Sequence, residues 1–225
     1  MNIDDAVCDY SDAFDISPYV NNIKQKWNDT KDIAEVEPNH RMWNGNPQHN
    51  TPAPKGWDLG MWKTIYGVQL SLLDDVIQKF NLPPTDHAWH QMWWHSKETA
   101  SFPMTLIPAL NGWDPRRVCL SLVIQGSLGD KNSLTYFPEY TDVESCNSHY
   151  KQLHDMNTKP EDYTNPPNTG PEYVVTGNVL LMNWDCGWQP TPVNLTNDIL
   201  TVKLSWIDYK YSEIKKIMDN SILGE

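Results

Sequence analysis

Apolar residues recur at helical spacing in three segments of the chain. The clearest is residues 68–80, VQLSLLDDVIQKF, whose apolar side chains fall on one helical face before Asn81 and two prolines end the pattern. A second helix is predicted over residues 18–28, because Ser17 and then Pro18 supply a capping residue and a proline at the first helical position. A third is predicted over residues 212–223, SEIKKIMDNSIL.

Beyond residue 84 the pattern changes to that of β-strands. Residues 117–126, RVCLSLVIQG, form an almost continuous apolar run, which is typical of a strand buried on both faces. A strand is also predicted at residues 133–137, SLTYF. In residues 172–184, EYVVTGNVLLMNW, the pattern predicts two strands that turn at Gly177 and Asn178.

Residues 199–209, ILTVKLSWIDY, alternate between apolar and polar side chains. Side chains of a strand point alternately to its two faces, so Lys203 and Ser205 share one face with Thr201, opposite the leucines and the valine. An ordinary solvent-facing lysine on an amphipathic strand is one interpretation of Lys203. A ligand-binding role, considered below, is the other.

These elements indicate a single, mainly β domain with flanking helices over residues 1–225. Residues 1–84 are expected to form a helical and irregular support, and residues 85–209 the β core. The C-terminal helix is expected within residues 210–225. Within these regions, proline, glycine and asparagine favour ordered irregular chain at residues 37–60, and the Pro-rich residues 139–171 are expected to form a surface insertion or lid.

The stretch DHAWHQMWWHS, residues 86–96, packs three histidines and three tryptophans closely together. Only as a helix could His87 and His90 converge, and the preceding prolines and the density of tryptophan favour a strand. On a strand, His87 and His95 lie about 26 Å apart and cannot share a metal, and Trp94 points away from the face of His95. His95 is the candidate ligand to consider, against the alternative of a structural histidine.

Charge and cysteine usage narrow the classes of partner. Seventeen basic against 29 acidic residues give a formal charge of −12, and no basic cluster appears, which argues against nucleic acid or membrane partners. The four cysteines, at positions 8, 119, 146 and 186, form no CxxC pair and are expected to be free thiols. With no signal peptide or apolar span in the sequence, a cytoplasmic location is expected. Eleven tryptophans against four phenylalanines favour either ligand stacking or a tryptophan-rich core.

Two stretches carry a family resemblance, SFPMTLIPALNGWDPRRVCLSLVIQG and GNVLLMNWDCGWQPTPVN with the following DILTVKLSW. Over residues 90–208 the order of strands and turns resembles that of the 2-oxoglutarate and iron(II)-dependent oxygenases. The resemblance implies a double-stranded β-helix, the cupin-like jelly roll, with a His-x-Asp pair and a distal histidine as metal ligands. In this sequence those positions fall on Thr105, Ile107 and Trp188, none of which is a normal ligand for iron(II).

One feature that the resemblance implies is present in this sequence. The last strand of the family carries a basic residue, with a hydroxyl two positions later, that holds the distal carboxylate of 2-oxoglutarate, and Lys203 with Ser205 has that spacing. We therefore expect a small-molecule or peptide ligand in an aromatic pocket, without a catalytic residue, a metal or an identified cofactor. The expected lining residues are Trp94, Thr105, Tyr136, Trp184, Trp188, Lys203 and Ser205.

Two alternatives remain open at the level of sequence. One is an active oxygenase that uses iron(II) and 2-oxoglutarate with ligands from other positions, such as His95, His149 or His154. The other is a non-catalytic structural or interaction protein whose tryptophans anchor an interface. The sequence leaves the oligomeric state open.

Overall fold

A computed structural model describes residue 4 and residues 7–32, 35–38, 61–95, 117–126, 133–137, 172–174, 177–183, 187–190 and 198–224. For residues 35–38, 61–63, 95, 133–137, 172–174 and 187–190 the description covers the backbone alone. The predicted insertion at residues 139–171 and most of the segment 37–60 lie outside the described residues.

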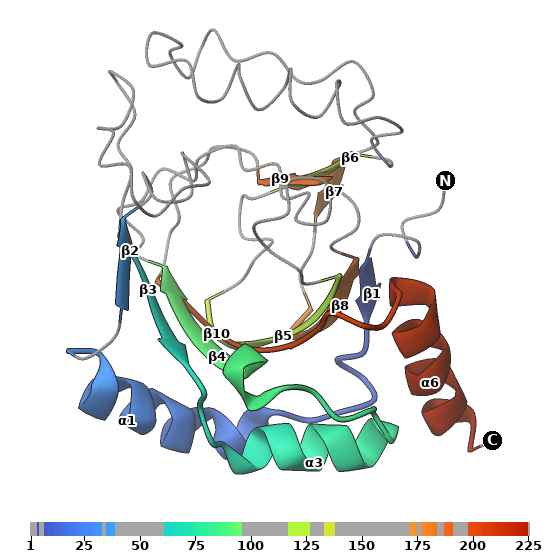
Figure 1. The fold of residues 1–225 in the computed structure, drawn as a ribbon, viewed down its shortest axis with the longest axis horizontal. Helices are drawn as coiled ribbons and strands as arrows, with labels where there is room; N and C mark the ends of the chain where they lie inside the picture. Colours follow the sequence, from blue (N-terminus) through green and yellow to red (C-terminus); the bar gives the residue numbers. More distant parts are fainter. Residues whose placement is uncertain are drawn as a thin grey trace, which may run out of the picture.

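A seven-stranded sheet dominates the molecule (Figure 1), and every neighbouring pair in it is antiparallel. Its order is β1-β8-β5-β10-β4-β3-β2. The strands in that order are Val7–Asp9, Val179–Asn183, Val118–Gln125, Ile199–Trp206, Gln91–His95, Met61–Tyr66 and Glu35–Pro38. The predicted mainly β character with flanking helices is confirmed, and β5 is buried on both faces as its apolar run predicts.

Three strands form a second, smaller sheet with the order β7-β6-β9. They are Glu172–Val174, Ser133–Phe137 and Gly187–Pro190. The expectation that residues 172–184 form two strands is correct, but the two do not pair with each other, because β7 joins the small sheet and β8 joins the large one. Gly177, just before β8, has the carboxylate of Asp9 where a Cβ would lie, so a larger residue there would have to displace this exposed side chain. Figure 1 places the small sheet on the concave side of the large sheet.

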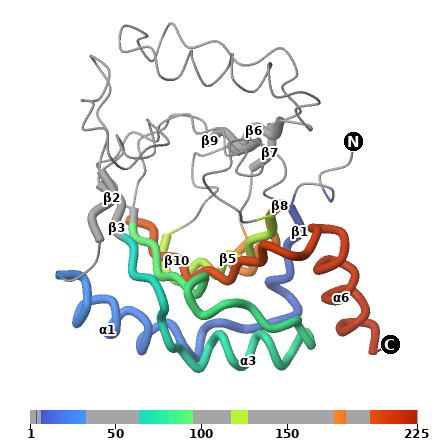
Figure 2. The backbone as a smooth tube through the Cα atoms, in the orientation of Figure 1, coloured from blue at the N-terminus to red at the C-terminus, as the bar shows by residue number. Residues whose placement is uncertain are grey.

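Helices cover the convex face of the large sheet (Figures 1 and 2). They are α1, Val20–Thr30, which follows the short 3-10 helix Ser17–Tyr19, then α3, Ser71–Phe80, and α6, Tyr211–Leu223. The three predicted helices are thus confirmed, although α3 begins three residues later than the apolar spacing suggests, because Leu70 is still extended. Asn81 ends α3 in the left-handed conformation (φ 50°), and the two prolines follow. No helix among the described residues is long and apolar enough to cross a membrane.

The first 84 residues contribute more strand than the sequence pattern indicates. They supply β1, β2 and β3, where a helical and irregular support was expected. β1 and β2 have only three and four residues, too few to display a period of two, and neighbouring strands decide their conformation. The turn after β1 is hydrogen-bonded to the start of β8, since the backbone nitrogens of Asn178 and Val179 donate to Ser11 Oγ at 2.8 and 3.2 Å.

The main core lies between the convex face and the helices. Leu72, Val76 and Phe80 of α3 are fully buried there. The strands contribute alternate residues to this core: Met92, Val118, Leu120, Leu122, Val179, Leu181, Leu200, Val202, Leu204 and Trp206. Because Leu200, Val202, Leu204 and Trp206 of β10 belong to this core, the alternate residues Thr201, Lys203 and Ser205 point to the concave side.

Candidate functional site

The concave face of the large sheet is lined with polar side chains at its centre. β10 places Thr201, Lys203 and Ser205 there, and the register decides which residues of the neighbouring strands join them. Lys203 lies directly between Gln91 of β4 and Ser121 of β5. Its two neighbours on the adjacent strands are therefore neutral side chains that can donate or accept hydrogen bonds.

The residues on either side of Lys203 along β10 have their own neighbours on the adjacent strands. Thr201 lies between Trp93 of β4 and Val123 of β5, and Thr64 of β3 is directly opposite Trp93. On the other side, Ser205 lies opposite Cys119. Cys119 Sγ is 3.6 Å from Ser121 Oγ, and that hydroxyl donates to Met182 Sδ at 3.6 Å. A thiol and a thioether thus border the hydroxyl groups at one corner of the face.

Lys203 is held by an aromatic ring. Its Nζ lies 3.5 Å from the centroid of the Trp93 ring, within the range of a cation–π interaction. The indole is fixed in turn by a hydrogen bond of 3.0 Å that Trp93 Nε1 donates to Gln91 Oε1. The ammonium group therefore occupies a defined position on the concave face, half-buried on a strand in the interior of the sheet. This position contradicts the interpretation of Lys203 as an ordinary solvent-facing residue.

Every buried polar residue among the described side chains lies on this face: Thr64, Gln91, Ser121, Thr201 and Ser205. Ser205 and Thr64 have exposed fractions of 0% and 1%. Neither Ser205 Oγ nor Thr64 Oγ1 has a hydrogen-bond partner among the described residues. Burial of a hydroxyl without a partner is unfavourable, so these two atoms mark positions where a polar atom of a ligand or a water would be stabilising.

The predicted pocket residues separate into groups. Lys203 and Ser205 lie together on the concave face, two residues apart on β10. Trp94 lies on the convex face, stacked on Trp27 of α1 at 6.2 Å between ring centroids, so it does not share a pocket with Lys203. Tyr136 and Trp188 occupy directly opposed register positions in the small sheet.

The remaining candidates are described in part or not at all. Thr105, Trp184, His149 and His154 lie outside the described residues. His95 is described by its backbone alone, at the end of β4 opposite Ile199. By alternation it occupies the same face of β4 as Trp93.

Sequence reasoning missed Gln91, Trp93, Thr64 and Ser121 as neighbours of Lys203. Alternation along β4 does place Gln91 and Trp93 on one face. The register between β4 and β10, which brings that face to Lys203, carries no signal in the sequence, since the two strands are about a hundred residues apart.

The interpretation of residues 86–96 as one strand is wrong in its first half. Asp86 Oδ1 accepts from the backbone nitrogen of Ala88 at 2.9 Å and starts a 3-10 helix, His87–Trp89, before β4 begins. Residues three apart eclipse in a 3-10 helix, so the rings of His87 and His90 converge to 5.1 Å. Burial, and secondarily His87, lowers the pKa of His90, whose Nε2 lies 2.9 Å from Thr85 Oγ1. Within the described ranges the pair has no third ligand, and no three His, Cys, Asp or Glu side chains there form a group that could hold a metal ion.

The arrangement can bind an anion. An ammonium group and buried hydroxyls donate hydrogen bonds to carboxylate oxygens, and charge-assisted bonds of this kind are stronger than neutral ones. No protein-family model matches the chain and no curated protein matches its sequence, so functional inference rests on the geometry of this face.

Proposed function

We propose that the chain is a double-stranded β-helix protein of the 2-oxoglutarate oxygenase type that binds a small carboxylate ligand on its concave face without the standard iron triad. The observation that carries this proposal is the half-buried ammonium group of Lys203, held over Trp93 beside the buried, unpartnered hydroxyl of Ser205.

Strand pairing supports the fold assignment. A jelly roll is a long antiparallel ribbon rolled into two sheets. In such a ribbon of eight strands the first pairs with the last, the third with the sixth and the fourth with the fifth. Rolling then pairs the eighth with the third and the seventh with the fourth. With β4 as the first strand and β10 as the eighth, all these pairings are present: β4 with β10, β5 with β8, β6 with β7, β10 with β5 and β9 with β6. The second position of the order falls between β4 and β5, outside the described residues.

The ligand class follows from the chemistry of β10. Lys203 and Ser205 are two residues apart on one face, about 6.6 Å along the strand. A carboxylate that accepts from the ammonium group would bring a second polar atom within reach of the serine hydroxyl. This is the arrangement by which the family resemblance implies recognition of the distal carboxylate of 2-oxoglutarate, and β10 is the last strand, as that resemblance requires.

The described residues do not fit iron(II). Trp188, on the strand where the resemblance implies the distal histidine, carries an indole, which offers a metal no lone pair. His95 is the candidate ligand on a described strand that lies outside the positions implied by the resemblance. It would supply one imidazole, whereas the facial triad needs two imidazoles and a carboxylate. We therefore propose no step that depends on a metal.

Thermal unfolding with 2-oxoglutarate, glutarate and succinate tests the proposal. A ligand that binds only the native state raises the melting temperature by mass action, so 2-oxoglutarate should stabilise the protein. Lys203→Met should abolish the shift and Ser205→Ala should reduce it. Lys216→Met, which removes an exposed lysine on α6, is the matched control and should leave the shift unchanged. Absence of a shift with all three dicarboxylates would overturn the proposal.

Adding iron(II) separates the proposal from its catalytic alternative. We expect no succinate production from 2-oxoglutarate, with or without Trp188→His, because a single restored imidazole leaves the site short of ligands. Iron-dependent succinate production that is lost in His95→Ala would instead identify an active oxygenase with displaced ligands.

A further inference from the structure

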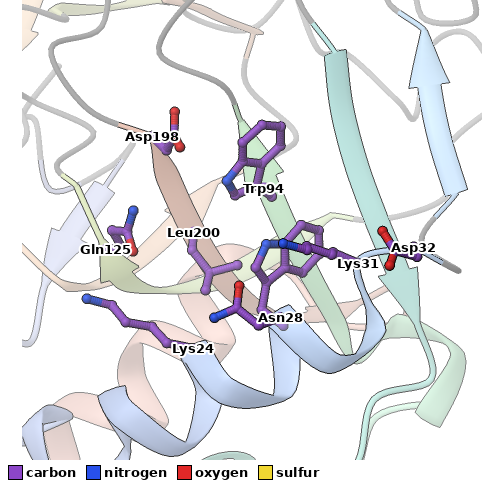
Figure 3. Close-up of a pocket in the computed structure, with 9 residues that line it drawn as sticks. Lys24, Asn28, Lys31, Asp32, Trp94, Gln125, Asp198 and Leu200 are labelled. Carbon is purple, nitrogen blue, oxygen red and sulfur yellow. The ribbon is translucent and has the colours of Figure 1, made fainter.

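A cavity lies on the other, helix-covered side of the large sheet. It has a volume of about 420 Å³ and lies between α1 and the neighbouring ends of β4, β5 and β10 (Figure 3). Its strand residues include Trp94 and Leu200, which face the helices, whereas Trp93 and Thr201 beside them face the concave side. The two sites therefore share strands but are separated by the thickness of the sheet.

The cavity has a rigid aromatic wall. Trp27 of α1 and Trp94 of β4 both line it, and their rings stack nearly parallel, with 6.2 Å between centroids and an interplanar angle of 18°. Trp27 is buried, while Trp94 is half-buried. Leu200 adds an apolar side chain to the lining. An ordered indole that is partly exposed offers a flat apolar surface at little entropic cost.

The charges of the described residues that line the cavity cancel. Lys24 lies on α1, Lys31 and Asp32 directly follow that helix, and Asp198 directly precedes β10. These two cations and two anions give the described lining residues a formal charge of zero. A phosphate or polycarboxylate would meet the aspartates and a polyamine would meet the lysines, so the charge pattern favours a neutral ligand.

Two amide side chains complete the polar lining. Asn28 reaches the cavity from α1 and Gln125 from the end of β5 (Figure 3). Each amide offers both a donor and an acceptor, while the lysines donate and the aspartates accept. A hydroxyl group is itself a donor and an acceptor, so a ligand rich in hydroxyls can form hydrogen bonds with both amides and with charged groups of either sign.

We propose that this cavity binds a neutral saccharide, with a sugar ring against the indole face of Trp94 and its hydroxyls on Asn28, Gln125 and the charged groups. The aromatic wall suits the C–H face of a pyranose, and the mixed donors and acceptors suit its edge. The volume is equivalent to about fourteen water molecules, which is space on the order of one or two sugar rings.

Two-dimensional NMR of the full chain tests the inference, with glucose, galactose, N-acetylglucosamine and cellobiose as probes. At least one of the four should cause saturable shifts of the indole N–H signals of Trp27 and Trp94. Asn28→Ala should raise the dissociation constant by about threefold to tenfold, the effect of losing one hydrogen bond. Asn22→Ala, an exposed asparagine outside the cavity lining on the same helix, is the matched control and should not change it.

Lys203→Met should leave saccharide binding intact, which keeps this inference independent of the ligand on the concave face. The inference fails if none of the four saccharides shifts the two indole signals up to its solubility limit, or if the binding is indifferent to Asn28→Ala. It also fails if inorganic phosphate binds the cavity more tightly than the sugars, because the site would then recognise an anion.

Discussion

The two faces of the large sheet are made by alternate residues of the same strands, yet they differ in kind. On the convex face, Leu204 and its neighbours are fully buried against the helices. On the concave face, the adjacent Ser205 is equally buried but has a hydroxyl without a partner among the described residues. The convex face therefore supplies stability, while the concave face retains polar groups that cost stability and that a ligand could satisfy.

In contrast to Ser205, polar side chains on the helical side of the sheet have hydrogen-bond partners. Tyr10 donates a 2.8 Å hydrogen bond to Asp219 of α6, and the same carboxylate forms a 2.7 Å ion pair with Lys215. Trp206 Nε1 donates to the backbone oxygen of Pro83 at 3.1 Å. Satisfied polar groups of this kind tie the ends of the chain and the helices to the sheet.

The largest difference between the faces should appear in a pair of neighbouring substitutions on β10. Leu204→Ala leaves a cavity in the packed core and should lower the free energy of unfolding by about 2 to 5 kcal/mol. Ser205→Ala removes a buried hydroxyl without a partner and should be neutral or slightly stabilising. Urea unfolding measures both. Equal losses would mean that the two faces do not differ in the way proposed.

Tyr10→Phe should have the next largest effect, because it removes a hydrogen bond to a carboxylate. At pH 7 the loss should be about 1.5 to 3 kcal/mol. Burial, and then the bond to Asp219, raises the pKa of Tyr10 far above its ordinary value of 10.0. The unfolded state therefore loses this proton first, and the wild-type protein loses up to about 1.4 kcal/mol per pH unit above pH 10.

The variant lacks that alkaline loss, so its deficit relative to wild type should shrink as the pH rises above 10. Urea unfolding at pH 7 and at alkaline pH measures the trend. Tyr209→Phe, in the segment between β10 and α6, is the control for removal of a phenol. A deficit that stays constant at alkaline pH would contradict the raised pKa.

Thr64→Val tests the concave face with a substitution of the same shape. Its hydroxyl is buried without a partner among the described residues, so its replacement by a methyl group should raise the free energy of unfolding by about 1 kcal/mol. Thermal unfolding without ligand gives this value. A loss of stability would indicate that Thr64 Oγ1 has a hydrogen-bond partner in solution, such as a bound water.

The smallest effect concerns the 3-10 helix before β4. Because burial lowers the pKa of His90 below 6.5, the unfolded state takes up the proton first, and stability should fall slightly as the pH drops below 6.5. His87→Ala removes the second cause of the shift and should raise the pKa of His90. NMR titration of the His90 ring measures this directly. An unchanged titration midpoint would exclude an interaction between the two rings.

Local pattern predicted the elements whose own residues decide them. The apolar face that includes Leu72, Val76 and Phe80 predicted α3. The helix ends at Asn81, which adopts the left-handed conformation. The continuous apolar run of β5 predicted burial on both faces. The polar face of β10 was likewise predicted, because alternation fixes which residues share a face before any partner strand is known.

The sequence by itself determined that Lys203 and Ser205 point the same way and that the convex residues of β10 form a core. Only the tertiary structure decided that Trp93, not Trp94, lies beside Lys203, because a cation–π contact depends on register between strands distant in the chain. It also decided that short segments such as β1 become strands, since their hydrogen-bond partners come from elsewhere in the chain. Periodicity is a property of one segment, whereas the register and burial of that segment depend on the other segments that pair with it and pack on it.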